Sequence, residues 1–333
     1  MNKTPLFKGF IVKFVIIRKS IDDVEELEFI VRRELILNEK ELMNLGELYR
    51  ELRVARGLKL KDVARGKLSV SQLSKFENGQ TMLAADKLLI AISGIHMSFA
   101  EFGHALNHYQ ESSFFATGKQ IAKLQIAGDV EGLKQLLNTL EDTETFDTYN
   151  RLNRIDVASA IHSLDPTYEI SKEDKKFLTN YLYGIEEWTE YELYLFGNTM
   201  SILSDADLIF LGKAFAERDK FYLSLPQHKK TAELTFLNII FALIDREELY
   251  YTAYFIDKLE KLVNYQDMFA IVVLNFLRQI LAYLKGEITT TKSMEDYIEM
   301  VEKLGNPTTA LVLRERMEEF CFKDKKRADD NSH

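Results

Sequence analysis

Few residues of this chain combine the types and spacing that catalysis or metal binding requires. His104 and His108 lie four residues apart, which would place both imidazoles on one face of a helix, where they could hold zinc. No cysteine or other obvious third ligand lies nearby, so we expect these histidines to have a surface or core role, with no metal and no other cofactor. The single cysteine, Cys321, has no identifiable base, and glycine-rich phosphate loops, G-x-S-x-G and H-E-x-x-H do not occur. We therefore do not expect an enzyme.

The side chains best suited to recognition lie in the stretch SVSQLSKFENG. Ser69 can cap a helix N-terminus, Gln72 completes a capping box, and Gly79 can end the helix. The stretch therefore predicts a helix of about two turns. Three apolar residues at three-residue spacing should face inward: Val70, Leu73 and Phe76.

The outer face of this predicted helix carries only short or flexible hydrogen-bonding groups before Glu77: Ser71, Gln72, Ser74 and Lys75. Such a face suits the major groove of DNA, although it is equally typical of a helix in a small helical bundle. The flanking segments favour DNA, since NLGELYRELRVARG, LKDVARG, LAADKLLIAIS and SFAEFGHALNHY each predict a short amphipathic helix. Five short helices, with the second and third joined by a tight turn, are typical of a helix-turn-helix domain.

Residues 44–110 resemble the lambda-repressor-like helix-turn-helix domain, and the pattern LGELYRELRVARGLKLKDVA…SVSQLSKFENG is similar to the Rgg family of bacterial transcriptional regulators. The resemblance implies that Arg53 and Glu77 form a structural ion pair between the first and third helices. It also implies that the base-reading positions are Val70, Ser71 and Lys75. Leu60 stands where many relatives carry a DNA-contacting Gln, so contact at the start of the second helix would come from Lys59 and Lys61 instead.

We expect Lys75 to contact guanine acceptors, with Ser71 and Gln72 beside it as further base contacts. Other basic residues of this region would contact phosphates, which position the protein without specifying sequence. These are Arg50, Arg56, Lys59, Lys61, Arg65 and Lys67.

The rest of the chain predicts a repeat. The segments ELYLFGNTMSIL, ELTFLNIIFALI and AIVVLNFLRQIL each place an Asn inside an apolar helix, at Asn198, Asn238 and Asn275. The intervals are 40 and 37 residues, and a second helical segment follows each one. This period predicts a right-handed array of tetratricopeptide-like helix pairs, so the fold class is all-α. Earlier pairs are expected at 114–140 and at 144–164 with 172–186, and a final helix at 308–320.

An Asn amide has two donors and one acceptor, which match a peptide backbone, so the three Asn residues could hold an extended peptide. Alternatively, each Asn bonds a neighbouring helix or a buried water. The stretch EWTEYELYLFGN resembles one typical of the Rgg regulators, whose C-terminal repeats bind short secreted and re-imported peptide pheromones. That resemblance implies a basic and amide cluster that contacts the peptide carboxylate, here in TFDTYNRLNRIDVASAI, with Arg151 as first choice and Arg154 as second.

Charge divides the chain unevenly. Residues 44–110 carry nine Lys and Arg against six Asp and Glu, whereas residues 111–333 carry 26 against 38. This asymmetry favours a basic module joined to an acidic body. We expect an extension of unknown role at 1–42, the helix-turn-helix domain at 43–110, a peptide-sensing and dimerisation repeat domain at 111–320, and a tail at 321–333.

The apolar run FKGFIVKFVII is broken by Lys13 and too short to span a bilayer, so we expect a cytoplasmic protein with no membrane partner. The sequence as a whole predicts a homodimeric transcription regulator that binds double-stranded promoter DNA under the control of a short hydrophobic signalling peptide. The alternative is a helical-repeat adaptor or antitoxin-like protein whose repeats bind a protein partner, with DNA binding not controlled by peptide.

Overall fold

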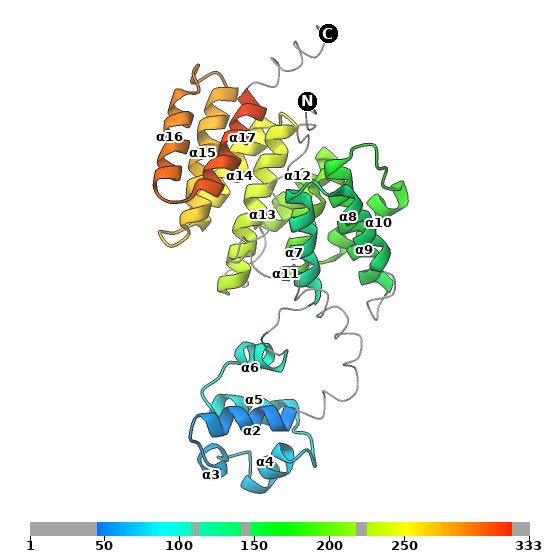
Figure 1. The fold of residues 1–333 in the computed structure, drawn as a ribbon, viewed down its shortest axis with the longest axis vertical. Helices are drawn as coiled ribbons and strands as arrows, with labels where there is room; N and C mark the ends of the chain where they lie inside the picture. Colours follow the sequence, from blue (N-terminus) through cyan, green and yellow to red (C-terminus); the bar gives the residue numbers. More distant parts are fainter. Residues whose placement is uncertain (1–44, 108, 110–112, 141–146, 218–224, 322–333) are drawn as a thin grey trace. The chain divides into compact units, whose positions relative to one another are not determined.

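The structure is a computed structural model that describes residues 45–107, 109, 113–140, 147–217 and 225–321. The predicted extension at 1–42, nearly all of the tail, and His108 lie outside the described residues. All regular secondary structure in the described ranges is helical, as predicted (Figure 1). These residues divide into two compact units, one ending at Lys119 and the other beginning at Gln120.

The N-terminal unit contains the five predicted short helices. They are α2 (Leu45–Ala55), α3 (Leu60–Val63), α4 (Val70–Glu77), α5 (Ala85–Gly94) and α6 (Phe99–Leu106). Their apolar faces meet in one core, whose largest fully buried side chains include Tyr49, Phe76 and Phe102. Burial of these aromatic rings is the main term that holds such short helices together.

Helices α2 and α4 approach each other closely at Gly46. A Cβ added at this glycine would lie 1.9 Å from the backbone carbonyl oxygen of Phe76. Only a residue without a side chain fits there, so Gly46 sets the distance between α2 and α4.

The rest of the described chain forms helix pairs in the predicted order, and the first of these helices begins at Ser113, before the boundary between the two units. These are α7 (Ser113–Ile126) with α8 (Val130–Thr139), α9 (Asp147–Leu164) with α10 (Lys172–Gly184), α11 (Glu190–Thr199) with α12 (Asp205–Glu217), α13 (Pro226–Asp245) with α14 (Leu249–Leu262), and α15 (Met268–Leu284) with α16 (Lys292–Lys303). Helix α17 (Pro307–Cys321) follows the last pair, and a 3₁₀ turn, η2 (Met200–Ile202), follows α11.

The first helices of successive pairs pack against one another in chain order: α9 on α11, α11 on α13, α13 on α15, and α15 on α17. We call α9, α11, α13, α15 and α17 the first-helix row. One continuous apolar core runs beneath it, with Phe196, Phe241 and Phe276 fully buried. Neighbouring pairs therefore share a core, as a repeat array requires.

Within the described ranges, no single helix has the length and apolar composition needed to cross a membrane. The bent pair of α5 and α6 passes that test together, by length and composition alone.

Candidate nucleic-acid interface and ligand-facing helices

Helix α4 begins with the predicted capping box. The backbone N–H of Gln72 donates to Ser69 Oγ at 3.1 Å, and the Ser69 N–H donates to Gln72 Oε1 at 3.2 Å. After the helix, Gly79 has a φ of 68°, a left-handed conformation that glycine adopts without strain. The Gln72 side-chain oxygen is thus occupied by the cap, and its amide nitrogen is the group left to donate outward.

The inward face of α4 is mostly as predicted, with one correction. Leu73 and Phe76 are buried, but Val70 is 45 % exposed. Val70 is the first residue of the helix, whereas Leu68 from the preceding turn is buried in the core at 2 % exposure. On the opposite face Ser71 and Lys75 are both exposed and lie four residues apart, so they are neighbours on the outer surface.

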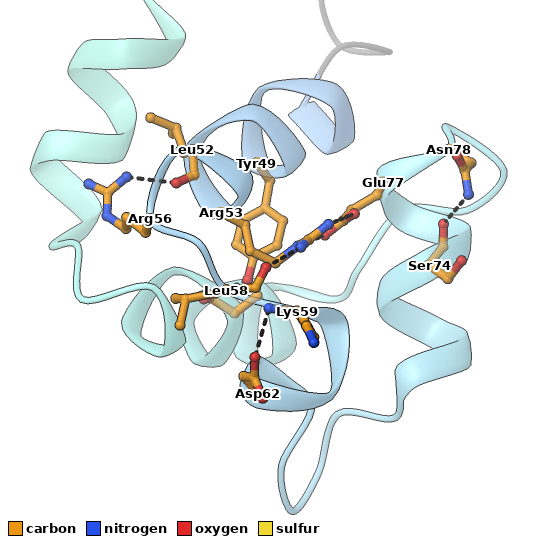
Figure 2. Close-up of polar contacts among 11 residues, drawn as sticks. Tyr49, Leu52, Arg53, Arg56, Leu58, Lys59, Asp62, Ser74, Glu77 and Asn78 are labelled. Atoms are coloured by element: carbon orange, nitrogen blue, oxygen red, sulfur yellow. Dashed lines mark hydrogen bonds and ion pairs between the residues drawn. The ribbon is translucent and has the colours of Figure 1, made fainter.

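A buried ion pair fixes the end of α4 to α2 (Figure 2). Arg53 Nε donates to Glu77 Oε1 at 2.6 Å and Nη2 donates to Oε2 at 2.7 Å, while Nη1 donates to the Leu58 carbonyl. The hydrogen bond with Glu77 raises the pKa of Arg53 above its usual value. This bidentate pair confirms the predicted structural role and turns the one carboxylate of α4 away from the outer face.

The six predicted phosphate contacts are all exposed: Arg50, Arg56, Lys59, Lys61, Arg65 and Lys67. Two of them also have local structural roles. Arg56 Nη1 donates to the Leu52 carbonyl at 2.8 Å at the end of α2, and the Lys59 N–H donates to Asp62 Oδ2 at 2.8 Å at the start of α3. Their charged groups lie at the surface, where they can attract a polyanion.

In the second unit, the three repeat Asn residues lie on α11, α13 and α15 of the first-helix row. Asn198 and Asn238 are buried and Asn275 is half-buried. Asn238 Nδ2 donates to the Gly197 carbonyl of α11 at 3.3 Å, and Asn275 Oδ1 accepts from Arg278 Nη1 at 3.3 Å. Asn238 therefore does bond a neighbouring helix. Its Oδ1, however, is buried without a hydrogen-bond partner among the described residues.

The sequence analysis did not identify two further polar residues of the first-helix row, Tyr191 and Tyr194. Tyr191 on α11 donates its hydroxyl to Asn153 Oδ1 on α9 at 3.2 Å. Burial and the nearby Asp156 raise the pKa of Tyr194 well above its ordinary value. Both tyrosines lie on the same face of α11 as Asn198, at spacings of seven and four residues. That helical spacing was the signal that could have found them.

Arg151 and Arg154 of α9 are directed to other helices. Arg151 binds Asp174 Oδ1 of α10 at 2.8 Å, and its guanidinium lies 4.2 Å from the centre of the Phe177 ring. Arg154 Nη1 donates to the Leu137 carbonyl of α8 at 3.3 Å. The structure thus brings neither arginine into contact with the three Asn residues.

No group of three or more His, Cys, Asp or Glu side chains in the described part of the chain could hold a metal ion. The His104 side chain is exposed and its ring stands edge-on to Tyr109, with centroids 5.6 Å apart. Burial raises the pKa of the Cys321 thiol to about 11, so the sulfur is held in its unreactive protonated form.

A short helix-turn-helix unit followed by stacked helix pairs defines a class of regulators in which one part contacts DNA and the other responds to a second molecule. Residues 133–315 match a known protein family, the C-terminal domain of HTH-type transcriptional regulators of the Rgg type. This match covers more than half of the chain, and the chain belongs to the Rgg family. That family consists of transcriptional regulators rather than enzymes.

Solved structures share the fold. A single-residue variant of the SHP pheromone receptor Rgg2 of Streptococcus dysgalactiae has a TM-score of 0.70 and 22 % identity, over 82 % of this chain and 97 % of that one. A candidate transcriptional regulator of Listeria monocytogenes EGD-e has a TM-score of 0.70 and 22 % identity, over 83 % and 98 %. PrgX in its complex with iCF10 has a TM-score of 0.64 and 14 % identity, over 85 % and 97 %. At these identities the likeness shows the fold alone.

Proposed function

We propose that this chain acts in the cytoplasm as a homodimer that binds promoter DNA through α4 and is controlled by a short apolar peptide bound on its first-helix row. Membership of the Rgg family supports the regulatory role. The pheromone receptor Rgg2 and the PrgX complex support a peptide as the controlling molecule, since both are similar in fold over almost their whole length.

The observation that supports DNA binding most strongly is the polar outer face of α4. Ser71 and Lys75 are exposed there, Gln72 presents its amide nitrogen beside them, and Glu77 is held inside by Arg53. In this proposal Ser71, Gln72 and Lys75 contact base edges. The exposed basic residues of α2, α3 and the turns that follow these two helices contact the phosphates.

The dimer follows from the size of the recognition helix. Helix α4 has eight residues, which can read only a few base pairs. Useful specificity then needs two copies on half-sites one helical turn, about 34 Å, apart. We place the dimer contact in the repeat unit.

The observation that supports peptide binding most strongly is the position of Asn238. Its Oδ1 is an unpaired acceptor on α13, and Asn198 and Asn275 occupy the corresponding helices on either side. A backbone N–H of an extended peptide would satisfy this oxygen once the side chain turns outward, which breaks its bond to the Gly197 carbonyl. Arg151, half-exposed on α9, would bind a peptide carboxylate by exchanging it for Asp174, and Arg154 would assist.

Fluorescence anisotropy of a labelled promoter duplex from beside the protein's own gene tests both halves. The full chain is titrated at moderate salt, with and without short apolar peptides encoded by neighbouring small reading frames, and with a shuffled duplex as control. Specific binding that a peptide shifts supports the proposal. Binding that no peptide shifts would favour a protein partner for the repeats, and equal binding to the shuffled duplex would contradict the DNA half.

A further inference from the structure

Helices α10 and α12, the second helices of two successive pairs, border a cavity of about 530 Å³ that is open to the surface and is also lined by the turn η2 after α11. Its lining is of mixed polar and apolar character, and its polar residues include Lys175, Lys176, Asn180, Ser201, Ser204 and Asp207. The volume lies within the range of about 300–1,000 Å³ that is usual for small-molecule sites.

The cavity has an excess of positive charge. Lys175 and Lys176 line it from α10, and neither forms an ion pair within the described ranges. The one lining carboxylate, Asp207, is already bonded at both oxygens: Ser204 Oγ donates to Oδ2 at 2.6 Å and the Tyr183 hydroxyl donates to Oδ1 at 2.7 Å. Two lysines beside the Asn180 amide favour an anion, because charge-assisted hydrogen bonds are the strong ones.

An aromatic edge adjoins the cavity. Tyr183 on α10 and Phe210 on α12 stand with ring centroids 5.1 Å apart and are 41 % and 57 % exposed. Tyr183 follows the lining residue Thr179 by four positions, and Phe210 follows Asp207 by three, so each ring lies one helical turn beyond the cavity on the same face. Exposed rings in such a position offer a stacking surface to a planar ligand group.

We propose that this cavity binds a small organic anion that carries both a phosphate and an aromatic ring, a nucleoside phosphate in chemical class. The phosphate lies against Lys175 and Lys176, beside the Asn180 amide. The ring lies on the edge formed by Tyr183 and Phe210. Nothing in this assignment depends on DNA binding or on the peptide.

The cavity is nevertheless linked to the first-helix row. Ser201 Oγ lies 3.0 Å from Ser159 Oγ, and Ser159 Oγ in turn donates to the backbone carbonyl of Asn198 at 3.0 Å. Ser201 belongs to the 3₁₀ turn η2, where the helical path of α11 tightens before α12. An anion held in the cavity beside Ser201 therefore lies at the end of the helix that carries Asn198. If the peptide proposal holds, this linkage makes the two sites neighbours in one hydrogen-bond chain.

Isothermal titration calorimetry of the full chain tests the assignment, with AMP, ATP, adenosine and inorganic phosphate as separate titrants and no DNA or peptide present. We expect AMP or ATP to bind, and adenosine and inorganic phosphate to bind at least about tenfold more weakly, because each lacks one of the two recognised groups. Absence of AMP and ATP binding would overturn the proposal. Inorganic phosphate that bound as tightly as AMP would overturn the role of the aromatic edge.

Two double variants separate a built site from general attraction to lysines. K175Q/K176Q should weaken binding of the nucleoside phosphate by about tenfold or more. K261Q/K303Q removes the same charge from exposed positions on α14 and α16 and should leave the affinity unchanged. Equal weakening in both would show nonspecific charge attraction and contradict the site. F210A should reduce the preference for AMP over inorganic phosphate, and an unchanged preference would count against stacking.

Discussion

Arg53 and Glu77 are both almost fully buried, so each charge is tolerated only because of the other. Arg53→Met should therefore destabilise the N-terminal unit by about 3–5 kcal/mol, whereas the pair Arg53→Met with Glu77→Leu should recover much of the loss. Amide hydrogen exchange of α2 and α4 in the full chain measures this directly. A single variant as well protected as the unaltered chain would show that the pair contributes little to stability.

Lys75 and Lys67 are both exposed lysines of the N-terminal unit, and we assign them different roles. Lys75→Ala should cost about 1–3 kcal/mol on the specific duplex and relax preference at one base pair. Lys67→Ala should weaken specific and shuffled duplexes alike and reduce the salt dependence by about one unit of slope. Anisotropy titrations at several salt concentrations separate the two. Equal loss on both duplexes for Lys75→Ala would contradict base readout.

The repeat Asn residues allow a test at the same scale. The double variant Asn238→Ala with Asn275→Ala removes the unpaired Oδ1 of Asn238 and the side-chain amide of Asn275 on α15. Peptide affinity should therefore fall about tenfold or more. DNA binding of the peptide-free protein should not change, and circular dichroism melting shows whether the repeats stay folded. Unchanged peptide affinity in a folded variant would leave these residues with a structural role only.

At the scale of single residues, the sequence predicts a hydrogen bond best where the side chain and its partner are close neighbours in the chain. The capping box of Ser69 and Gln72 is local, and the pattern revealed it. The contacts of Arg151 depend on which helix lies beside it, and Asp174 is 23 residues away. Val70 shows the same limit, because three-residue spacing cannot tell that this first residue of the helix stays at the surface while Leu68 is buried.

At the scale of elements, the contact of α2 with α4 rests on one glycine. Gly46→Ala would place a Cβ 1.9 Å from the Phe76 carbonyl oxygen, a backbone atom that cannot rotate away, so the helices must separate. We expect a loss of about 1–3 kcal/mol in stability and weaker DNA binding, because α4 would shift. The matched control is Gly103→Ala in α6, where nothing lies within 4 Å of the added Cβ. That change should be neutral or slightly stabilising. Equal behaviour of the two variants would show that close approach does not matter.

The number and order of helices were predictable because each is marked by a cap, an apolar stripe or a glycine stop. The recurrence of Asn198, Asn238 and Asn275 gave the period of the repeats, and the packing of α11, α13 and α15 in sequence confirms it. The 3₁₀ turn after Thr199 was not predictable. It arises where Arg246 of the next pair donates to the Met200 carbonyl at 2.7 Å, a contact 46 residues away.

For the whole molecule, the charge asymmetry between the two units was visible in the sequence and has a measurable consequence. Six exposed basic residues per protomer are available for phosphates, so a dimer on two half-sites should bind with a logarithmic salt slope of about −11, and a single half-site with about half that value. The acidic repeat unit adds repulsion at low salt, which disfavours nonspecific DNA more than specific DNA. Anisotropy titrations on full and half operators measure both slopes.

Symmetry provides the sharper test of the dimer. Two copies of α4 fixed by one protein dimer can reach half-sites only on the same face of the duplex, about one helical turn apart. Inserting five base pairs between the half-sites rotates one of them to the opposite face, so affinity should fall to that of a half-site. Titrations of the two operators with the same protein preparation give the answer, with a five-base-pair substitution at unchanged length as the control. Gly46 and the pair of Arg53 and Glu77 hold α4 to α2, so the recognition helix keeps its orientation within its own unit. Undiminished binding to the lengthened operator would contradict a dimer that fixes the spacing of its two recognition helices.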